Sequence, residues 1–335
     1  MNIKVINKGL RITAYILTLI LLLSACTENK PEVDESVASV AETTEDESLV
    51  AEQSAESESF SKVESGEEVS FEEESSKEES ALPVNPYTPR IPLPETLETD
   101  AIDSYFNGSV FVGYSIMMHF GRYIGEWHSE IDPSIMGNPV FCAAPGISFY
   151  ADRTQAPEDE KSTLPLFKGK RYNFKDLPAA TGCNNMYIGL MGYSEVKRYG
   201  ASGACRETVN GIKRVLEANP GLNLVILACT YNTGVYDEKL PEKLNNANIR
   251  EYNQKVLEYC TENGIDFVDV ATPLTTHNGY LPLSFATDGK YHIAKHAFYL
   301  WVEALRDYAR QKQAGTWQNP AVLPEMPSAH LYDTL

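Results

Sequence analysis

Residues 96–312 predict an α/β domain, a three-layer α/β/α sandwich around a mainly parallel sheet of five strands. Two features of the sequence favour this class. Short, continuous apolar runs alternate with longer segments of helical periodicity, and such runs are typical of strands covered on both faces. The length of the segment also suits one domain with a full hydrophobic core.

The alternation can be followed along the chain. Aliphatic and β-branched runs predict strands at residues 109–113, 139–143, 185–191, 222–228 and 265–270. Helical spacing predicts helices at residues 115–124, 202–218, 245–263 and 293–310. In the second of these helices Val209, Ile212 and Val215 share one face. Gly264 directly follows the third helix, and glycine commonly ends helices.

One edge of the predicted sheet is the expected place for a ligand. In mainly parallel sheets, ligands bind beyond the carboxyl ends of the strands. Ser115, Gly192 and the loop after Val270 each follow a predicted strand. We therefore expect these three positions to meet at the same edge.

The first 26 residues are typical of an export signal. Lys4, Lys8 and Arg11 precede an apolar run at residues 12–23, and Leu-Ser-Ala then leads to Cys26. This ending resembles the bacterial lipobox, which implies that Cys26 is acylated and holds the protein to membrane lipid on the extracytoplasmic side. An uncleaved membrane anchor is the alternative, because the apolar run approaches the shortest length that spans a bilayer.

Residues 27–95 are expected to form a disordered tether, acidic and rich in Ser and Glu at first and then rich in proline. Residues 27–80 hold 19 acidic side chains and three lysines, so they account for most of the formal net charge of −19. Dense like charge with few apolar residues does not provide enough burial to offset the entropy of ordering. The C-terminal residues 313–335 lack periodicity and are expected to be loosely ordered.

Composition also narrows the partners of the domain. No basic patch is present, which argues against nucleic acid as a partner. The five remaining cysteines have no CxxC spacing, which argues against zinc and redox chemistry and leaves their disulfide state open: Cys142, Cys183, Cys205, Cys229 and Cys260. We expect no cofactor, no metal and a tethered monomer.

Two distant stretches carry the chemistry of the chain. Ser115 stands where an apolar strand meets the start of a helix, and Asp288 and His292 lie one short loop apart. These are the components of a serine nucleophile, its base and the carboxylate that orients the base. Each residue also has a structural interpretation: Ser115 as a helix N-cap, Asp288-Gly289 as a turn, and His292 as a surface residue.

These stretches resemble the sequence blocks of the SGNH, or GDSL, hydrolase superfamily, over about residues 103–309. Gly113-Tyr114-Ser115 is similar to the first block, Gly146 to the glycine of the second, Gly192-Tyr193-Ser194-Glu195 to the third, and Asp288 with His292 to the fifth. The resemblance implies a flavodoxin-like sandwich that hydrolyses esters, often acetyl groups on sugars, without a cofactor. It implies a Ser115–His292–Asp288 triad and an oxyanion hole formed by Ser115, Gly146 and Ser194.

Three positions depart from the family pattern. Tyr114 replaces the aspartate of the first block, and Ser194 replaces an asparagine whose amide helps bind the oxyanion. Asp288 and His292 are separated by three residues rather than two. Tyr114 and Tyr193 adjoin the matched blocks and are candidates for contacts with an acylated glycan.

Three functions remain open from the sequence. The leading hypothesis is a surface-anchored serine ester hydrolase, a carbohydrate O-acetylesterase. The second is a catalytically weakened pseudo-hydrolase that binds glycans, because two family positions are replaced. The third is an O-acyltransferase, which needs the same triad and differs only in the acceptor of the acyl group.

Overall fold

The fold is known from a computed structural model, which describes residues 98–189, 192–240 and 242–326. The predicted signal with Cys26, the tether at residues 27–95 and residues 327–335 lie outside the described residues. In the part of the chain that the structure describes, no helix is both long enough and apolar enough to cross a membrane.

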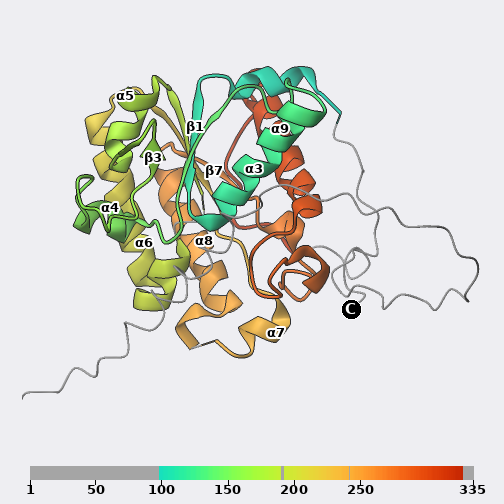
Figure 1. The fold of residues 1–335 in the computed structure, drawn as a ribbon. Helices are drawn as coiled ribbons and strands as arrows, with labels where there is room; N and C mark the ends of the chain where they lie inside the picture. The colour runs from blue at the N-terminus through green and yellow to red at the C-terminus, as the bar shows by residue number, and fades with distance from the viewer. Residues whose placement is uncertain (1–97, 190–191, 241, 327–335) are drawn as a thin grey trace, which may run out of the picture. The chain divides into compact units, whose positions relative to one another are not determined.

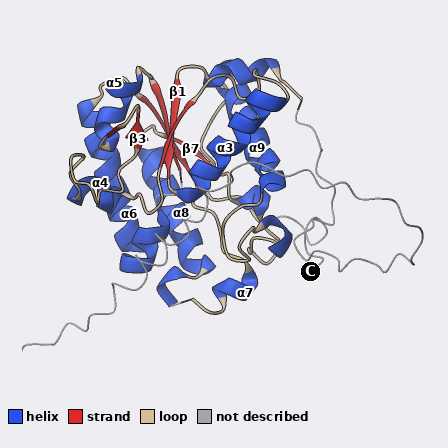
Figure 2. Ribbon diagram, viewed as in Figure 1, coloured by secondary structure: helices blue, strands red, loops and turns tan. Residues whose placement is uncertain are grey.

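A parallel sheet of five strands forms the centre of the domain (Figures 1 and 2). Its strands lie in the order β2-β1-β5-β6-β7, and all neighbours in it are parallel. They span β1 Ser109–Gly113, β2 Val140–Ala143, β5 Asn185–Gly189, β6 Asn223–Leu227 and β7 Asp266–Val268. In chain order this is the 2-1-3-4-5 arrangement of flavodoxin-like sheets, so the predicted fold class is confirmed.

Helices cover both faces of the sheet (Figure 1). One side carries α3 Ser115–Glu130 and α9 Phe298–Ala314, whose Phe120 and Trp301 rings lie 5.3 Å apart. The other side carries α4 Phe149–Thr154, α5 Leu177–Thr181, α6 Gly192–Ala218 and α8 Asn246–Glu262. The described residues also form the short helix α7 Gly234–Asp237, a small hairpin of β3 Leu166–Phe167 and β4 Lys170–Arg171, and several short 3-10 helices.

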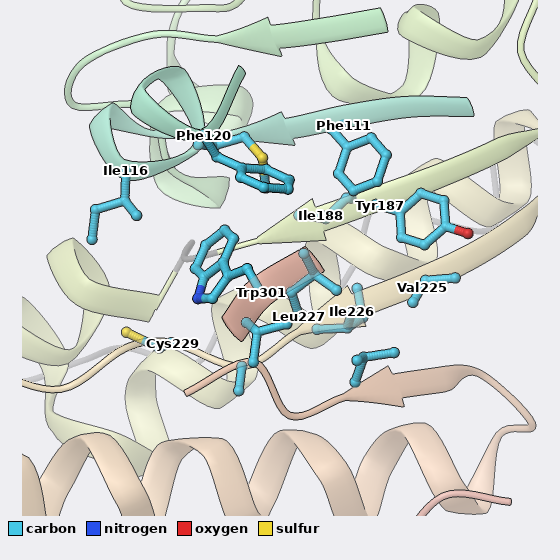
Figure 3. Packing of buried hydrophobic residues seen from close by; sticks show 14 of the residues in the cluster. Phe111, Ile116, Phe120, Tyr187, Ile188, Val225, Ile226, Leu227, Cys229 and Trp301 are labelled. Atoms are coloured by element: carbon cyan, nitrogen blue, oxygen red, sulfur yellow. The ribbon is translucent and has the colours of Figure 1, made fainter. Parts of the chain in front are cut away.

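The core lies between the sheet and these helices. Phe111 of β1 stacks on Tyr187 of β5 with 4.4 Å between ring centroids, and Trp301 closes the same region from α9 (Figure 3). Burying such rings removes large apolar surfaces from water, which is the main source of stability here. All five cysteines of the domain are free thiols, and all but the half-buried Cys205 are buried.

Three helices differ from the prediction. The first ends at Glu130 instead of Ile124. The last helix begins at Phe298 instead of Ile293, because Ile293 pairs with Ala286 in a β-bridge and cannot take helical dihedral angles. The helix predicted at residues 202–218 begins earlier, at Gly192, and is kinked at Gly200. Gly200 has φ +68° and ψ 177°, a conformation that is open only to glycine.

The expectation of a loose C-terminal segment is wrong for residues 316–326. Trp317 packs edge-on against Tyr308 of α9, and Leu323 is only 4% exposed. The Asn319 side chain accepts a hydrogen bond from the Phe267 N–H and donates one to the Ile265 carbonyl. These scattered contacts hold the segment without any periodicity that the sequence could reveal.

Candidate active site

Ser115 lies at the carboxyl edge of the sheet, where the strand order reverses. Strand β1 is flanked by β2 and β5, and a crevice at such a switch point is where ligands bind in open α/β sheets. Tyr114 is extended, and Ser115 is the first residue of α3. An added Cβ at Gly113 would lie 2.7 Å from the Gly189 carbonyl oxygen, so glycine lets the two strand ends approach closely at this point.

The Ser115 side chain contacts the predicted base. Its Oγ lies 2.9 Å from Nε2 of His292, although the two residues are 177 positions apart in the chain. The position before Ser115, Tyr114, occupies the N-cap of α3 and makes no side-chain capping bond. The interpretation of Ser115 as an N-cap is therefore wrong, and its hydroxyl is directed to the imidazole.

Asp288 holds His292 from the other side. Its Oδ2 lies 2.7 Å from Nδ1 of His292, while its Oδ1 accepts the backbone N–H groups of Lys290, Tyr291 and His292 at 2.8, 3.1 and 3.2 Å. One carboxylate thus contacts the imidazole and also stabilises the turn, so the turn holds one residue more than the family pattern and still brings Asp288 to His292. The interpretation of Asp288 as a turn residue is correct, and its carboxylate also contacts the His292 imidazole.

The charge of Asp288 is favoured by its surroundings. Partial burial alone would raise the pKa of its carboxyl. The hydrogen bonds from the His292 ring and the Lys290 backbone outweigh this effect and lower the pKa below its ordinary value. Because the carboxylate is ionised at neutral pH, the Nδ1 atom of His292 carries the proton. Nε2 is then free to accept the Ser115 hydroxyl proton.

Backbone pairing holds His292 in place. The Thr287 N–H donates to the His292 carbonyl at 2.8 Å, and the Ala294 N–H donates to the Phe285 carbonyl at 2.7 Å. With the Ala286–Ile293 bridge, these bonds close a small loop around residues 287–292. This pairing positions the imidazole, and it is the same pairing that delays the start of α9.

Gly146 lies in a turn beside the end of β1. The Ile147 N–H reaches back to the Ala144 carbonyl at 3.4 Å, and Pro145 followed by Gly146 at φ +71° is the pattern of a type II turn. The Ala144 N–H donates to the Gly113 carbonyl at 3.2 Å, which fixes this turn next to the strand that leads to Ser115. Gly146 itself is exposed.

Ser194 and Glu195 lie in the first turn of α6. Ser194 is exposed, and no hydrogen bond among the described residues joins it to Ser115 or His292. Glu195 is 1% exposed, and its Oε1 accepts the Tyr150 N–H at 3.1 Å. Burial raises the pKa of Glu195 to about 7, although hydrogen bonds from Tyr150 and its own backbone oppose that shift. Glu195 thus ties the Ser194 turn to the segment that follows Gly146.

Tyrosine rings surround the Ser–His pair. Tyr114 is 8% exposed, and burial raises the pKa of its phenol well above the ordinary value. Its ring lies 6.3 Å from that of Tyr193, which in turn lies 4.7 Å from that of Tyr291. The Tyr114 and Tyr193 hydroxyls are buried without a well-formed hydrogen bond. The two predicted tyrosines therefore lie at the site, together with a third.

A second histidine at the site was missed from the sequence. His119 lies one helical turn after Ser115 on α3, and its ring centroid is 5.3 Å from that of His292. Burial, and then the proximity of His292, lower the pKa of His119, so its neutral ring packs against the base. The i, i+4 spacing from Ser115 could have revealed it. The described residues contain no group of three or more His, Cys, Asp or Glu side chains arranged as metal ligands.

Comparison with known proteins gives structural neighbours only. The chain is similar to a GDSL-like lipase from Bacteroides thetaiotaomicron, at 13% identity over 61% of this chain and 88% of that one, with a TM-score of 0.45. It is also similar to a member of the lipolytic protein G-D-S-L family from Veillonella parvula, at 15% identity over 59% of this chain and 96% of that one, with a TM-score of 0.38. A lipase/acylhydrolase from Enterococcus faecalis is similar at 10% identity over 63% of this chain and 98% of that one, with a TM-score of 0.40. No family model and no curated protein matches the chain. At this level of similarity, function must be argued from the site.

Proposed function

We propose that this protein is a serine ester hydrolase that acts on O-acetylated carbohydrates. The proposal rests above all on the two hydrogen bonds that join Ser115 to His292 and His292 to Asp288, at 2.9 and 2.7 Å. A nucleophile, a base and an orienting carboxylate in this arrangement are what acyl transfer through a covalent intermediate requires.

The reaction follows from this geometry. Ser115 Oγ attacks the acyl carbon while its proton moves to Nε2 of His292, and Asp288 stabilises the imidazolium that forms. His292 then protonates the departing alcohol oxygen, which leaves an acyl group on Ser115. Water attacks this acyl group with His292 again as base, which releases the acid and restores the hydroxyl.

The oxyanion would be bound largely by the backbone. Ser115 is the first residue of a 16-residue helix, where N–H groups have no intrahelical partner and the helix dipole favours negative charge. The Gly146 N–H and the Ser194 hydroxyl are the two further donors in the proposal. The first lies in a turn fixed beside Gly113, and the second lies on the α6 turn that Glu195 ties to the same region.

The test is hydrolysis by the full chain and by Ser115→Ala. The parent should release acetate from p-nitrophenyl acetate and from O-acetylated xylo-oligosaccharides, and Ser115→Ala should lose at least about 10³-fold in kcat on both. Ser129→Ala, an exposed serine on the same helix, is the matched control and should keep the parent's rates. Equal rates for Ser115→Ala and the parent would remove Ser115 from the mechanism.

The proposal places this activity at the outer side of the membrane. Acylation of Cys26 and a long acidic segment would hold the domain at a distance from the lipid, within reach of wall or environmental glycans. Metabolic labelling with an alkyne fatty acid should mark the parent and not Cys26→Ala. Labelling that persists in Cys26→Ala would contradict this part of the proposal.

A further inference from the structure

Three tyrosine rings pack against one another beside the proposed base, and we name this cluster the tyrosine platform: Tyr193, Tyr236 and Tyr291. The Tyr291 ring lies 4.4 Å from the His292 ring, 4.7 Å from Tyr193 and 6.0 Å from Tyr236. The three residues come from α6, from α7 and from the loop that holds His292. Segments far apart in the chain thus bring aromatic faces together at one position.

Hydrogen bonds hold the platform together. Thr233, the N-cap of α7, donates its N–H to the Lys290 carbonyl and its hydroxyl to the Gly289 carbonyl, both at 2.7 Å. These bonds fasten α7, with Tyr236, to the chain segment between Asp288 and His292. Asp288 fixes the same segment by accepting three backbone N–H groups, so the positions of Tyr291 and Tyr236 relative to His292 are fixed.

The surface of the platform is amphipathic. The three tyrosines are half-buried as residues, and the hydroxyl of Tyr193 is buried. The neighbouring Val235 is 56% exposed, and the Lys290 ammonium lies 5.7 Å from the Tyr236 ring centroid. Tyrosine offers a wide apolar face with a polar edge and loses little conformational entropy on binding. A sugar ring has the complementary form, with apolar C–H faces and hydroxyls around its rim.

The position of the platform indicates which half of the ester, the acyl group or the alcohol, it contacts. In the proposed reaction His292 protonates the departing alcohol oxygen, so the alcohol half of the ester must lie on the His292 side of Ser115. Tyr291 contacts His292 directly and Tyr236 packs against Tyr291, whereas the acyl oxygen is expected near Gly146 and Ser194, at the end of the platform where Tyr193 lies. The end of the platform formed by Tyr291 and Tyr236 is therefore next to the leaving group.

We propose that the tyrosine platform binds the sugar ring that carries the ester, and so selects carbohydrate alcohols over simple ones. This inference rests on the proposed ester hydrolysis and names the part of the substrate that the site recognises. Tyr236 is the specificity residue to test, because its ring packs against Tyr291 and, among the described residues, it makes no hydrogen bond or ring contact with Ser115 or His292.

The first experiment compares two acetyl esters in the full chain. Acetate release is measured from O-acetylated xylo-oligosaccharides and from ethyl acetate, which has the same acyl group and no ring. Tyr236→Ala should lower the ratio of the two kcat/KM values three- to tenfold, the effect expected from losing one aromatic contact. Tyr259→Ala, a tyrosine near the carboxyl end of α8, is the matched control and should leave the ratio unchanged.

A ratio that stays within twofold in Tyr236→Ala, with hydrolysis intact, would overturn the platform and leave the hydrolase standing. A second outcome would also overturn the platform. If Tyr236→Ala lowers the kcat/KM ratio of phenyl acetate to ethyl acetate but not that of the sugar ester to ethyl acetate, the tyrosines bind an aryl alcohol instead of a sugar.

A binding measurement separates this inference from the proposed function. Calorimetry of Ser115→Ala with O-acetylated xylo-oligosaccharides should give a Kd that rises three- to tenfold when Tyr236→Ala is added. This result supports the platform even if the parent hydrolyses no ester. An absence of binding, or an equal Kd in both proteins, overturns it.

Discussion

The two sides of Ser115 are built differently. On the side proposed for proton transfer, a side-chain hydrogen bond of 2.9 Å joins Ser115 to His292, and one of 2.7 Å joins His292 to Asp288. On the side proposed for the oxyanion, Gly146 and Ser194 are exposed, and no hydrogen bond among the described residues joins either to Ser115. In the proposed reaction the fold itself positions the base, whereas stabilisation of the oxyanion would depend on backbone N–H groups and on the turns that carry them.

Asp288→Asn should have the largest effect on the proton-transfer side. Asn keeps an Oδ1 acceptor for the three backbone N–H groups, so the loop shape is retained, but its amide donates a hydrogen to Nδ1 of His292. Nε2 then carries the proton and cannot accept one from Ser115. We expect kcat on p-nitrophenyl acetate to fall about 10³- to 10⁴-fold with an unchanged melting temperature. A loss below tenfold would show that the carboxylate does not orient the base.

Glu195→Gln tests how the oxyanion side is held together. The pKa of Glu195 is raised from 4.5 to about 7, so between these values the unfolded chain binds fewer protons than the folded one. The parent therefore loses stability as pH rises through this window, by about 3 kcal/mol in total, and the loss is constant above pH 7. Gln stays neutral at every pH.

Denaturant unfolding at pH 4, 7 and 9 measures this difference. The stability of Glu195→Gln relative to the parent should increase from pH 4 to pH 7 and then level off. A difference that does not vary with pH would mean that the carboxyl titrates normally. Glu207→Gln, an acid only 19% exposed that pairs with Arg153, is the control and should not reproduce the profile.

Ser194→Ala should have the smallest effect. A well-placed oxyanion donor contributes about 10²–10³ to turnover, but the Ser194 hydroxyl is exposed and short. We expect kcat to fall about tenfold, with KM little changed. A fall comparable with that of Asp288→Asn would show that the two sides of Ser115 contribute equally and that Ser194 closes onto the substrate.

The sequence predicted most of the fold because its signals are local. The central strands are short apolar runs, and each predicted strand overlaps an observed one, with ends within about three residues. The proximity of Ser115, Asp288 and His292 was also predictable, since these residues follow strands or turns whose residue types are specific. Their sequence spacing does not show that they meet. The expected parallel sheet does, because the carboxyl ends of its strands lie at one edge.

What the sequence could not predict depends on long-range contacts. The start of α9 is set by the β-bridge between Ala286 and Ile293. The sequence does not reveal this bridge, because the helical spacing of apolar residues continues through Ile293. The place of Tyr236 depends on bonds from Thr233 to a loop more than fifty residues away. Glu195 is buried because the Ser148–Tyr150 segment packs over it, whereas the sequence around Glu195 suggests only an acidic residue on the surface.

Labelling of the full chain with a fluorophosphonate, followed by mass spectrometric mapping of the modified peptide, tests the account most directly. Because the reagent reacts only with a hydroxyl that an adjacent base activates, we predict one phosphonyl adduct, on Ser115, that is absent from His292→Ala and from heat-unfolded protein. An unlabelled native protein, or an adduct on a different serine, would contradict the assignment of Ser115 and His292 as nucleophile and base.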